Sequence, residues 1–188
     1  MAYIKVHYSL VYFCSLFNHG AAANNFQDKQ LQELDYFKIR FLLPSINKSI
    51  DQMEVENSAI RIGLNLIKGV SSVTVKKILR KRSQLPNGCF TDLKEVILSF
   101  LNMKIDLNTV NRLIFSGVFN EFKISKTKCQ YFFNEAYNSS VKTYANKNVV
   151  ETVFSARKEI KNRDENFVDK QTELLGINHN LIVDEAKC

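Results

Sequence analysis

Apolar positions along the chain recur mainly at helical spacing. Residues 3–17 and 28–36 are predicted to form helices, the first of them mostly buried, with a linker over residues 20–25. Helical patterns on a polar background also cover residues 126–144 and 149–161. From residue 162 to the end the pattern weakens, and we expect a loosely ordered tail there.

A short β element interrupts the helices. Residues 37–42 alternate weakly between apolar and polar side chains, and the segments 53–55 and 60–64 flank Asn57 and Ser58. Such a pattern predicts a β hairpin that turns at these two residues. The expected fold class is therefore mainly α with a small β hairpin or sheet (α+β). At 188 residues, one domain or two small subdomains are expected.

A glycine turn follows this β element and opens directly into a helix. Gly69 permits a tight turn, and either Ser71 or Ser72 can cap the helix that comes next. The unpaired backbone N–H groups at a helix start form a ready anion site. One face of the helix is apolar, with Val75 and Ile78 at helical spacing.

The rest of this helix is basic. No acidic residue occurs anywhere in residues 68–82, and the whole chain has a formal net charge of +7. This charge favours attraction to phosphate, although a basic helix face is also typical of a plain solvated helix in a bundle. Sequence-independent DNA contacts are predicted for Lys68, Gly69, Val70, Ser71, Ser72, Lys76, Lys77, Arg80 and Arg82.

Two further helices are predicted after the basic one. Thr91 can cap a helix that ends near Phe100. Either Asp106 or Asn108 can cap the next helix, which stops at Gly117.

Residues that support catalysis or metal binding are scattered. The acidic residues show no paired metal-ligand spacing, and no HExxH sequence is present. The cysteines are too far apart for a zinc module and are expected to be reduced thiols: Cys14, Cys89, Cys129 and Cys188. Neither a catalytic residue nor a metal or other cofactor is therefore predicted for this chain.

The glycine turn and basic helix resemble the helix-hairpin-helix motif. The resemblance rests on residues 68–71 followed by Val75, Ile78 and Arg82. In the motif a glycine, a hydrophobic residue and a second glycine precede the helix. Ser71 stands at the second glycine position in this chain.

The segments around the motif resemble, in order, the alpha (catalytic) subunit of bacterial DNA polymerase III, a C-family polymerase. The resembling segments are residues 2–8, 44–49, 60–64, 67–70, 90–93, 113–120 and 173–176. The resemblance implies an interior fragment with these parts: residues 1–36 as a helical end of the fingers, 37–66 as a small β element, 67–122 as the helix-hairpin-helix DNA-binding region and 123–188 as a helical extension with the loose tail. Asn111 and Asn120 depart from the family, which usually carries carboxylates there.

This resemblance implies a role in DNA replication in the cytoplasm. The expected partners are the DNA backbone and the remaining alpha-subunit domains or holoenzyme subunits, with no membrane. The family is a DNA-directed DNA polymerase that uses Mg²⁺, but its metal-binding aspartates lie in a palm region upstream of Met1. The chain is therefore not expected to be catalytic alone. The alternative is a packing module, or a decaying truncated copy, that does not bind DNA.

The N-terminus also has the outline of a secretory signal peptide. Lys5 precedes an apolar run over residues 8–17, and residues 21–23 are three alanines that suit a cleavage site. The run is too short to span a bilayer. His7 and Asn18 argue against export, and an amphipathic core helix is the other interpretation.

Overall fold

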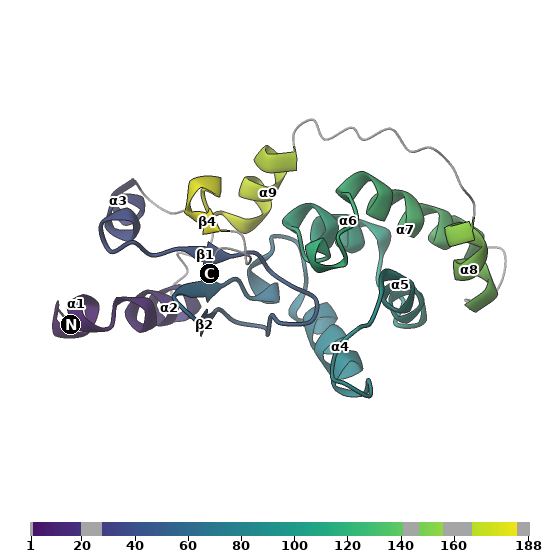
Figure 1. The fold of residues 1–188 in the computed structure, drawn as a ribbon, viewed down its shortest axis with the longest axis horizontal. Helices are drawn as coiled ribbons and strands as arrows, with labels where there is room; N and C mark the ends of the chain where they lie inside the picture. Colours follow the sequence, from purple (N-terminus) through teal and green to yellow (C-terminus); the bar gives the residue numbers. More distant parts are fainter. Residues whose placement is uncertain (1, 20–27, 141–146, 156–166, 184–188) are drawn as a thin grey trace.

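The computed structural model describes residues 2–19, 28–140, 147–155 and 167–183. It confirms the predicted α+β class, because helices surround a small sheet in an elongated molecule (Figure 1). In chain order the elements are α1 (Ala2–His7), α2 (Ser9–His19), α3 (Asp28–Tyr36), β1 (Phe41–Leu42), β2 (Glu54–Glu56), β3 (Ala59–Arg61), the 3₁₀ turn η2 (Leu64–Leu66), α4 (Ser72–Ser83), α5 (Leu93–Asn102), α6 (Leu107–Ser116), η3 (Asn120–Phe122), α7 (Lys126–Ser140), α8 (Lys147–Ser155), α9 (Phe167–Leu175), η4 (His179–Leu181) and β4 (Ile182–Val183).

The sheet combines the predicted hairpin with two parallel strand pairs. Its strand order is β2-β3-β1-β4. β2 and β3 pair antiparallel, with Val55 opposite Ile60. β1 runs parallel to both of its neighbours, so Phe41 pairs with Ile60 on one side and with Ile182 on the other.

Helix α2 packs on the sheet with its apolar side. Phe13 and Phe17 are almost fully buried, and the Phe17 ring centroid lies 5.8 Å from that of Phe41 on β1. The side chain of Asn18 accepts a hydrogen bond from the Met53 N–H at 2.8 Å and donates one to the Met53 carbonyl at 2.9 Å. The apolar run near the N-terminus therefore contributes Phe13, Cys14 and Phe17 to the core. Residues 21–23 of the suggested cleavage site lie outside the described residues.

The loop over residues 44–49 joins the sheet to the helical part. The Asn47 side chain accepts from the Phe90 N–H at 2.7 Å and donates to the Phe90 carbonyl at 2.9 Å. The Ser49 hydroxyl donates to the Ile62 carbonyl at 2.8 Å, just after β3. These bonds fix the loop against both the sheet and the helical part of the molecule.

A cluster of phenylalanines holds the helical part together. Phe100 on α5, Phe119 after α6 and Phe133 on α7 are each at most 4% exposed. The Phe133 ring centroid lies 5.9 Å from that of Phe100 and 5.5 Å from that of Phe119. Helix α7 also contacts α6 and α8, so these helices form one bundle at one end of the molecule (Figure 1).

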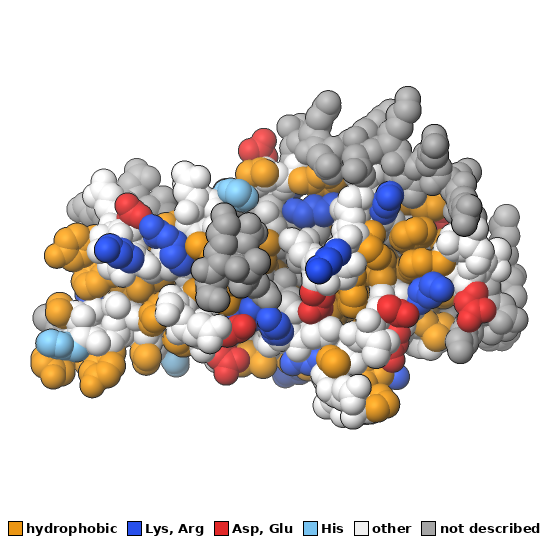
Figure 2. All heavy atoms as spheres, viewed as in Figure 1, with side chains coloured by type: hydrophobic (Ala, Val, Ile, Leu, Met, Phe, Trp, Pro, Cys, Tyr) orange, Lys and Arg blue, Asp and Glu red, His pale blue; other side chains and the backbone are white. Residues whose placement is uncertain are grey.

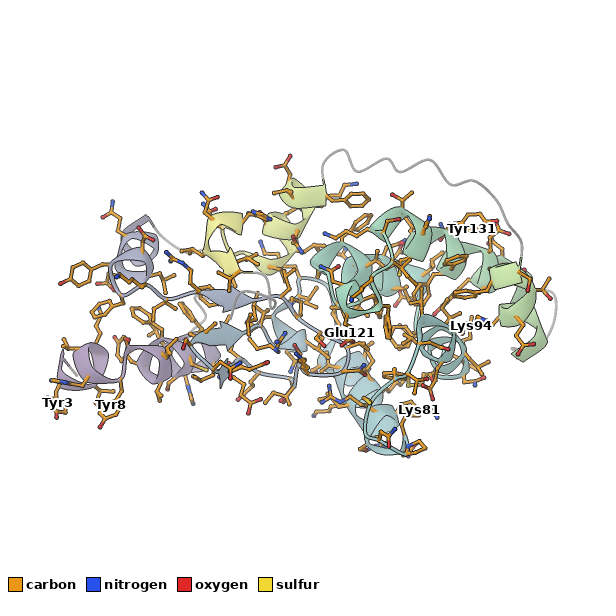
Figure 3. The ribbon with its side chains drawn as sticks, in the orientation of Figure 1. Tyr3, Tyr8, Lys81, Lys94, Glu121 and Tyr131 are labelled. Atoms are coloured by element: carbon orange, nitrogen blue, oxygen red, sulfur yellow. The ribbon has the colours of Figure 1, made fainter. Side chains whose placement is uncertain are left out.

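The N-terminal helix differs from its prediction. Residues 3–17 were expected to form one mostly buried helix, but the chain bends at Tyr8 between α1 and α2. Tyr3, Val6 and Tyr8 are more than 60% exposed, because only α2 of this pair lies on the sheet. Figure 3 shows Tyr3 and Tyr8 projecting from the outer side of this end of the molecule.

The start of α5 and the C-terminal region also differ. Asp92, not Thr91, is the cap, because its carboxylate accepts from the Glu95 N–H at 2.8 Å. Thr91 instead donates to the Glu95 carboxylate. Where a loose tail was expected, residues 167–183 form α9 and β4, and β4 pairs with β1. The predicted helix ends beyond residues 140 and 155 lie outside the described residues.

Three other features concern the described residues: their cysteines, the length of their helices and the grouping of potential metal ligands. Cys14, Cys89 and Cys129 are free, and burial raises the pKa of the Cys129 thiol to about 12. Cys188 lies outside the described residues. In the described part of the chain, no helix has the length and apolar character to cross a bilayer, and no three His, Cys, Asp or Glu side chains are grouped to hold a metal ion.

Candidate nucleic-acid interface

The first hairpin joins η2 to α4 through the Gly69 turn. Gly69 has φ +78°, a left-handed conformation that strains any residue with a Cβ atom. The Val70 side chain is buried, and its N–H donates to the Ile67 carbonyl at 3.1 Å. The Val70 N–H is thus already bonded inside the turn and is a poor donor to a phosphate. Val70 was nevertheless among the predicted contacts.

Ser71 caps α4, as the sequence suggested. Its hydroxyl accepts a hydrogen bond from the Thr74 N–H at 3.2 Å. The N–H groups of Ser72 and Val73 lie in the first turn of α4, where no partner exists inside the helix. Ser71 and Ser72 are exposed, so this helix start offers N–H donors and a positive dipole end without a nearby carboxylate on α4.

Helix α4 separates apolar and basic side chains as predicted. Val75 and Ile78 are fully buried, whereas Lys76, Lys77 and Arg80 are exposed. The Lys77 ammonium donates to the Met103 carbonyl at 3.3 Å. Lys81, labelled in Figure 3, lies near the far end of the helix and is partly buried.

Arg82 has a different environment from the other basic residues of α4. Its guanidinium donates to the Ile46 carbonyl at 3.1 Å and to the Ser49 carbonyl at 2.7 Å. Burial lowers its pKa, and the nearby Glu121 carboxylate opposes that shift. Arg82 is therefore committed to holding the loop over residues 44–49, which makes it a structural residue more than a phosphate contact.

A second hairpin between α5 and α6 repeats the geometry of the first. Lys104 has φ +53° at the place of Gly69, and Ile105 is buried like Val70. Asp106 is the cap, and its carboxylate accepts from the Thr109 N–H at 2.8 Å. The second hairpin thus places a carboxylate where the first has a neutral serine, and this negative charge opposes phosphate binding there.

The Asp106 cap gives a pH-dependent contribution to stability. The Thr109 hydroxyl bond lowers the Asp106 pKa below the ordinary value of 3.8, despite opposing desolvation. Because the folded pKa is depressed, the charge-dependent stabilisation is present above pH 3.8 and lost as pH falls through the folded pKa.

We expect Asp106→Ala to lower the unfolding free energy by about 1 kcal/mol at neutral pH. Urea titrations at neutral and acidic pH should show this difference shrinking in acid; a constant difference would contradict the assignment.

Arg112 on α6 was missed by the sequence reasoning, yet it lies against the Gly69 turn. Its Nη1 donates to the Lys68 carbonyl at 3.1 Å. A Cβ atom on Gly69 would lie 2.6 Å from the guanidinium carbon, so a side chain there would displace the Arg112 guanidinium from the turn, and the positive φ is the reason that glycine is favoured. The Lys68 N–H donates to the Leu174 carbonyl of α9 at 3.0 Å. The hairpin turn is therefore fixed by two distant helices, and no local signal in the sequence reveals this.

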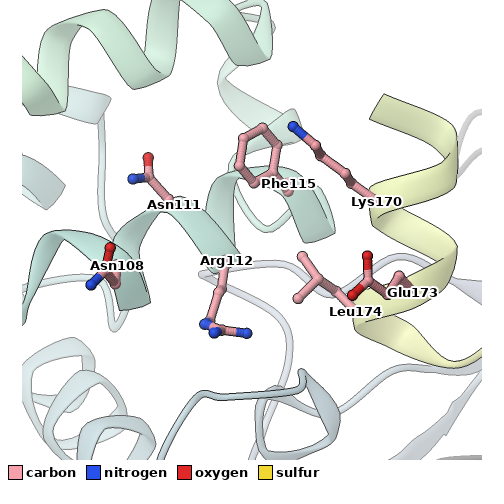
Figure 4. Close-up of a pocket in the computed structure, with 7 residues that line it drawn as sticks. All are labelled: Asn108, Asn111, Arg112, Phe115, Lys170, Glu173 and Leu174. Atoms are coloured by element: carbon pink, nitrogen blue, oxygen red, sulfur yellow. The ribbon is translucent and has the colours of Figure 1, made fainter. Parts of the chain in front are cut away.

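Arg112 also lines a pocket between α6 and α9 (Figure 4). Asn111, one of the two departures from the family pattern, lies in the same pocket, and its side-chain oxygen accepts from Gln130 at 3.3 Å. The other departure, Asn120, begins η3 and is exposed.

The predicted DNA contacts fall into three groups in the structure. Four lie together at the turn before α4: Lys68, Gly69, Ser71 and Ser72. Three more follow along the exposed face of α4, namely Lys76, Lys77 and Arg80, whereas Arg82 lies apart from them.

Comparison with known proteins agrees with this architecture. The family model of the helix-hairpin-helix motif matches residues 38–129, which include both hairpins. The DNA polymerase III subunit alpha of Bacillus subtilis (strain 168) is 34% identical over 65% of this chain and 11% of its own length. The subunits of Chlamydia muridarum and Mycoplasma genitalium are each 24% identical, over 94% and 90% of this chain and 15% and 18% of their own lengths.

The chain thus spans between about a tenth and a fifth of the length of these relatives. The matches cover the hairpins, and two of them extend over nearly all of the chain. They show that the chain is similar to a segment of DNA polymerase III alpha subunits that carries a helix-hairpin-helix motif.

Proposed function

We propose that this segment grips DNA by its sugar-phosphate backbone, without reading base sequence, as part of a DNA polymerase III alpha subunit. One observation carries the proposal: the neutral-capped start of α4 adjoins the Gly69 turn and a continuous basic helix face. N–H donors of the first turn would bind one phosphate. Lys68 and the exposed Lys76, Lys77 and Arg80 would bind its neighbours along the strand.

The proposal assigns only binding to this chain. Nucleotidyl transfer belongs to the carboxylates of the family's palm region, which would hold Mg²⁺ and supply the metal-ion chemistry of the reaction. The remaining domains of the alpha subunit and other holoenzyme subunits would be its protein partners. A protein that replicates chromosomal DNA in a bacterium would act in the cytoplasm.

A direct test measures binding of the full chain to two short labelled duplexes of unrelated sequence. We expect similar affinity for both, because phosphate contacts carry no sequence information. The variant Lys76→Gln, Arg80→Gln should bind about tenfold more weakly, since it loses two cations from the exposed face of α4. Both side chains are exposed, so circular dichroism should show an unchanged fold.

Lys38→Gln is the matched control. Lys38 is exposed and follows α3, at the opposite end of the molecule from the bundle and away from α4 in Figure 1. It removes one positive charge where the α4 variant removes two, so a general effect of net charge would appear here at about half the size. Equal weakening per removed charge in the control and the α4 variant would contradict a grip located on α4.

A second candidate function is a packing module that touches DNA little. The observation that favours it is the apolar surface of α1 and α2, where hydrophobic side chains gather at one end of the molecule (Figure 2). Tyr3, Ile4, Val6, Tyr8 and Val11 are each more than half exposed. Such a surface suits contact with another domain of the alpha subunit. A folded chain that fails to bind either duplex would favour this candidate over the first.

A further inference from the structure

The pocket between α6 and α9 opens beside the first hairpin. Its volume is about 330 Å³. Arg112 on α6 lines one end of it, with its guanidinium pointing toward the Gly69 turn, and Lys170 on α9 lines the other end beside Phe115, with Glu173 on the same helix as Lys170 (Figure 4). The side-chain amides of Asn108 and Asn111 complete the polar part of the wall. The pocket therefore combines two cations, one carboxylate and neutral hydrogen-bonding groups.

Each of the two cationic side chains contacts a neighbouring group of the protein. The Arg112 guanidinium bonds the Lys68 carbonyl at 3.1 Å through one of its five N–H donors, which leaves the fork geometry able to bind an anion as well. The Lys170 ammonium lies 4.8 Å from the centroid of the Phe115 ring, at the pocket wall. Positioned cations bind phosphate with less loss of side-chain freedom than mobile surface lysines.

The pocket is continuous with the proposed phosphate grip. Lys68 bonds Arg112 through its carbonyl and the Leu174 carbonyl through its N–H, and both of these partners line the pocket. The Gly69 turn thus lies beside the pocket on one side and leads into the start of α4 on the other. A DNA strand lying across the turn would meet both places.

We propose that this pocket is a second phosphate subsite, in which Arg112 and Lys170 bind neighbouring phosphodiesters of the same DNA strand that the first hairpin holds. Asn108 and Asn111 donate hydrogen bonds to these phosphates or the adjoining sugars. Glu173 weakens the subsite by its charge. This inference rests on the proposed DNA grip and names residues of it that the hairpin motif does not contain.

The experiment measures duplex affinity across a salt series for the full chain and for three single variants. Lys170→Gln should weaken binding and reduce the slope of log affinity against log salt by about 0.9, the loss of one phosphate contact. Glu173→Gln should strengthen binding, because it removes the only carboxylate among the described residues that line the pocket. Lys38→Gln should change neither quantity. Because Lys170 and Glu173 are exposed, these changes should leave the fold intact.

The outcomes separate the two proposals. If the wild-type chain binds and the α4 variant weakens it, while Lys170→Gln and Glu173→Gln bind like wild type, only the pocket assignment is overturned. If the wild-type chain does not bind DNA, the grip itself fails. Inorganic pyrophosphate is the probe for a free phosphate ligand: tight pyrophosphate binding that Lys170→Gln abolishes, without any change in duplex affinity, would overturn the DNA assignment.

Discussion

Replacing Phe133 with alanine is expected to lower the free energy of unfolding by about 3–5 kcal/mol. Phe133 is fully buried on α7 and packs against the rings of Phe100 and Phe119. Alanine would remove most of a buried aromatic side chain and leave a cavity where α5, α7 and the chain after α6 meet. A urea titration followed by circular dichroism measures the change.

Tyr36→Ala is the matched control for this aromatic deletion. Tyr36 is 81% exposed at the end of α3, so its loss should cost less than about 1 kcal/mol. The account requires a clear gap between the two variants. If Phe133→Ala were no more destabilising than the control, the phenylalanine cluster would not be what holds the bundle around the second hairpin.

The second large effect is expected from Glu56→Ala, at about 3 kcal/mol or more of lost unfolding free energy. The Arg61 side chain is only 3% exposed, and its guanidinium pairs with both carboxylate oxygens of Glu56. It also donates to the Leu43 carbonyl at 2.7 Å. Removing the carboxylate leaves a buried guanidinium without this bidentate ion pair, and that desolvated charge is the reason for the size of the effect.

Glu54→Ala tests whether the loss is specific to the buried pair. Glu54 lies two residues earlier on β2 and is exposed, so its removal should change the unfolding free energy by about 0.5 kcal/mol or less. Thermal or urea unfolding of the two variants in parallel makes the comparison. A similar small loss in both would mean that water or another group replaces Glu56 at Arg61.

Local features of the fold were predictable because their causes are local. A glycine turn followed by a capping serine fixes the start of α4, and Asp106 with Gly117 fixes both ends of α6. The antiparallel hairpin was also visible, because its two strands are separated by only two residues. In each case the residues that determine the structure are adjacent in the chain.

The parallel pairing of β1 with β4 was not predictable. Ile182 and Val183 form a two-residue strand, too short for a period of two, and it reaches β1 only through the tertiary fold. Arg112 and Lys170 were not identified as site residues from the sequence, because they too reach the site only through the tertiary fold. They come from α6 and α9, and only the folded chain brings these helices to the Gly69 turn.

Arg82 is a residue for which the sequence did hold a usable signal. It follows Ile78 by four positions and Val75 by seven, and this spacing places it on the buried face of α4. Its positive charge alone suggested phosphate binding. Helical periodicity would have assigned it to the interior side, where it bonds the carbonyls of Ile46 and Ser49.

The central claim is that the basic face of α4 binds DNA phosphates, and salt dependence tests it most directly. Duplex affinity of the full chain and of Lys76→Gln, Arg80→Gln should be measured over a range of salt concentrations, with circular dichroism on both. The account predicts a linear fall of log affinity with log salt for the wild-type chain and a slope smaller by about two contacts, roughly 1.8, in the variant. A folded wild-type chain without salt-dependent binding, or an unchanged slope in the variant, would contradict it.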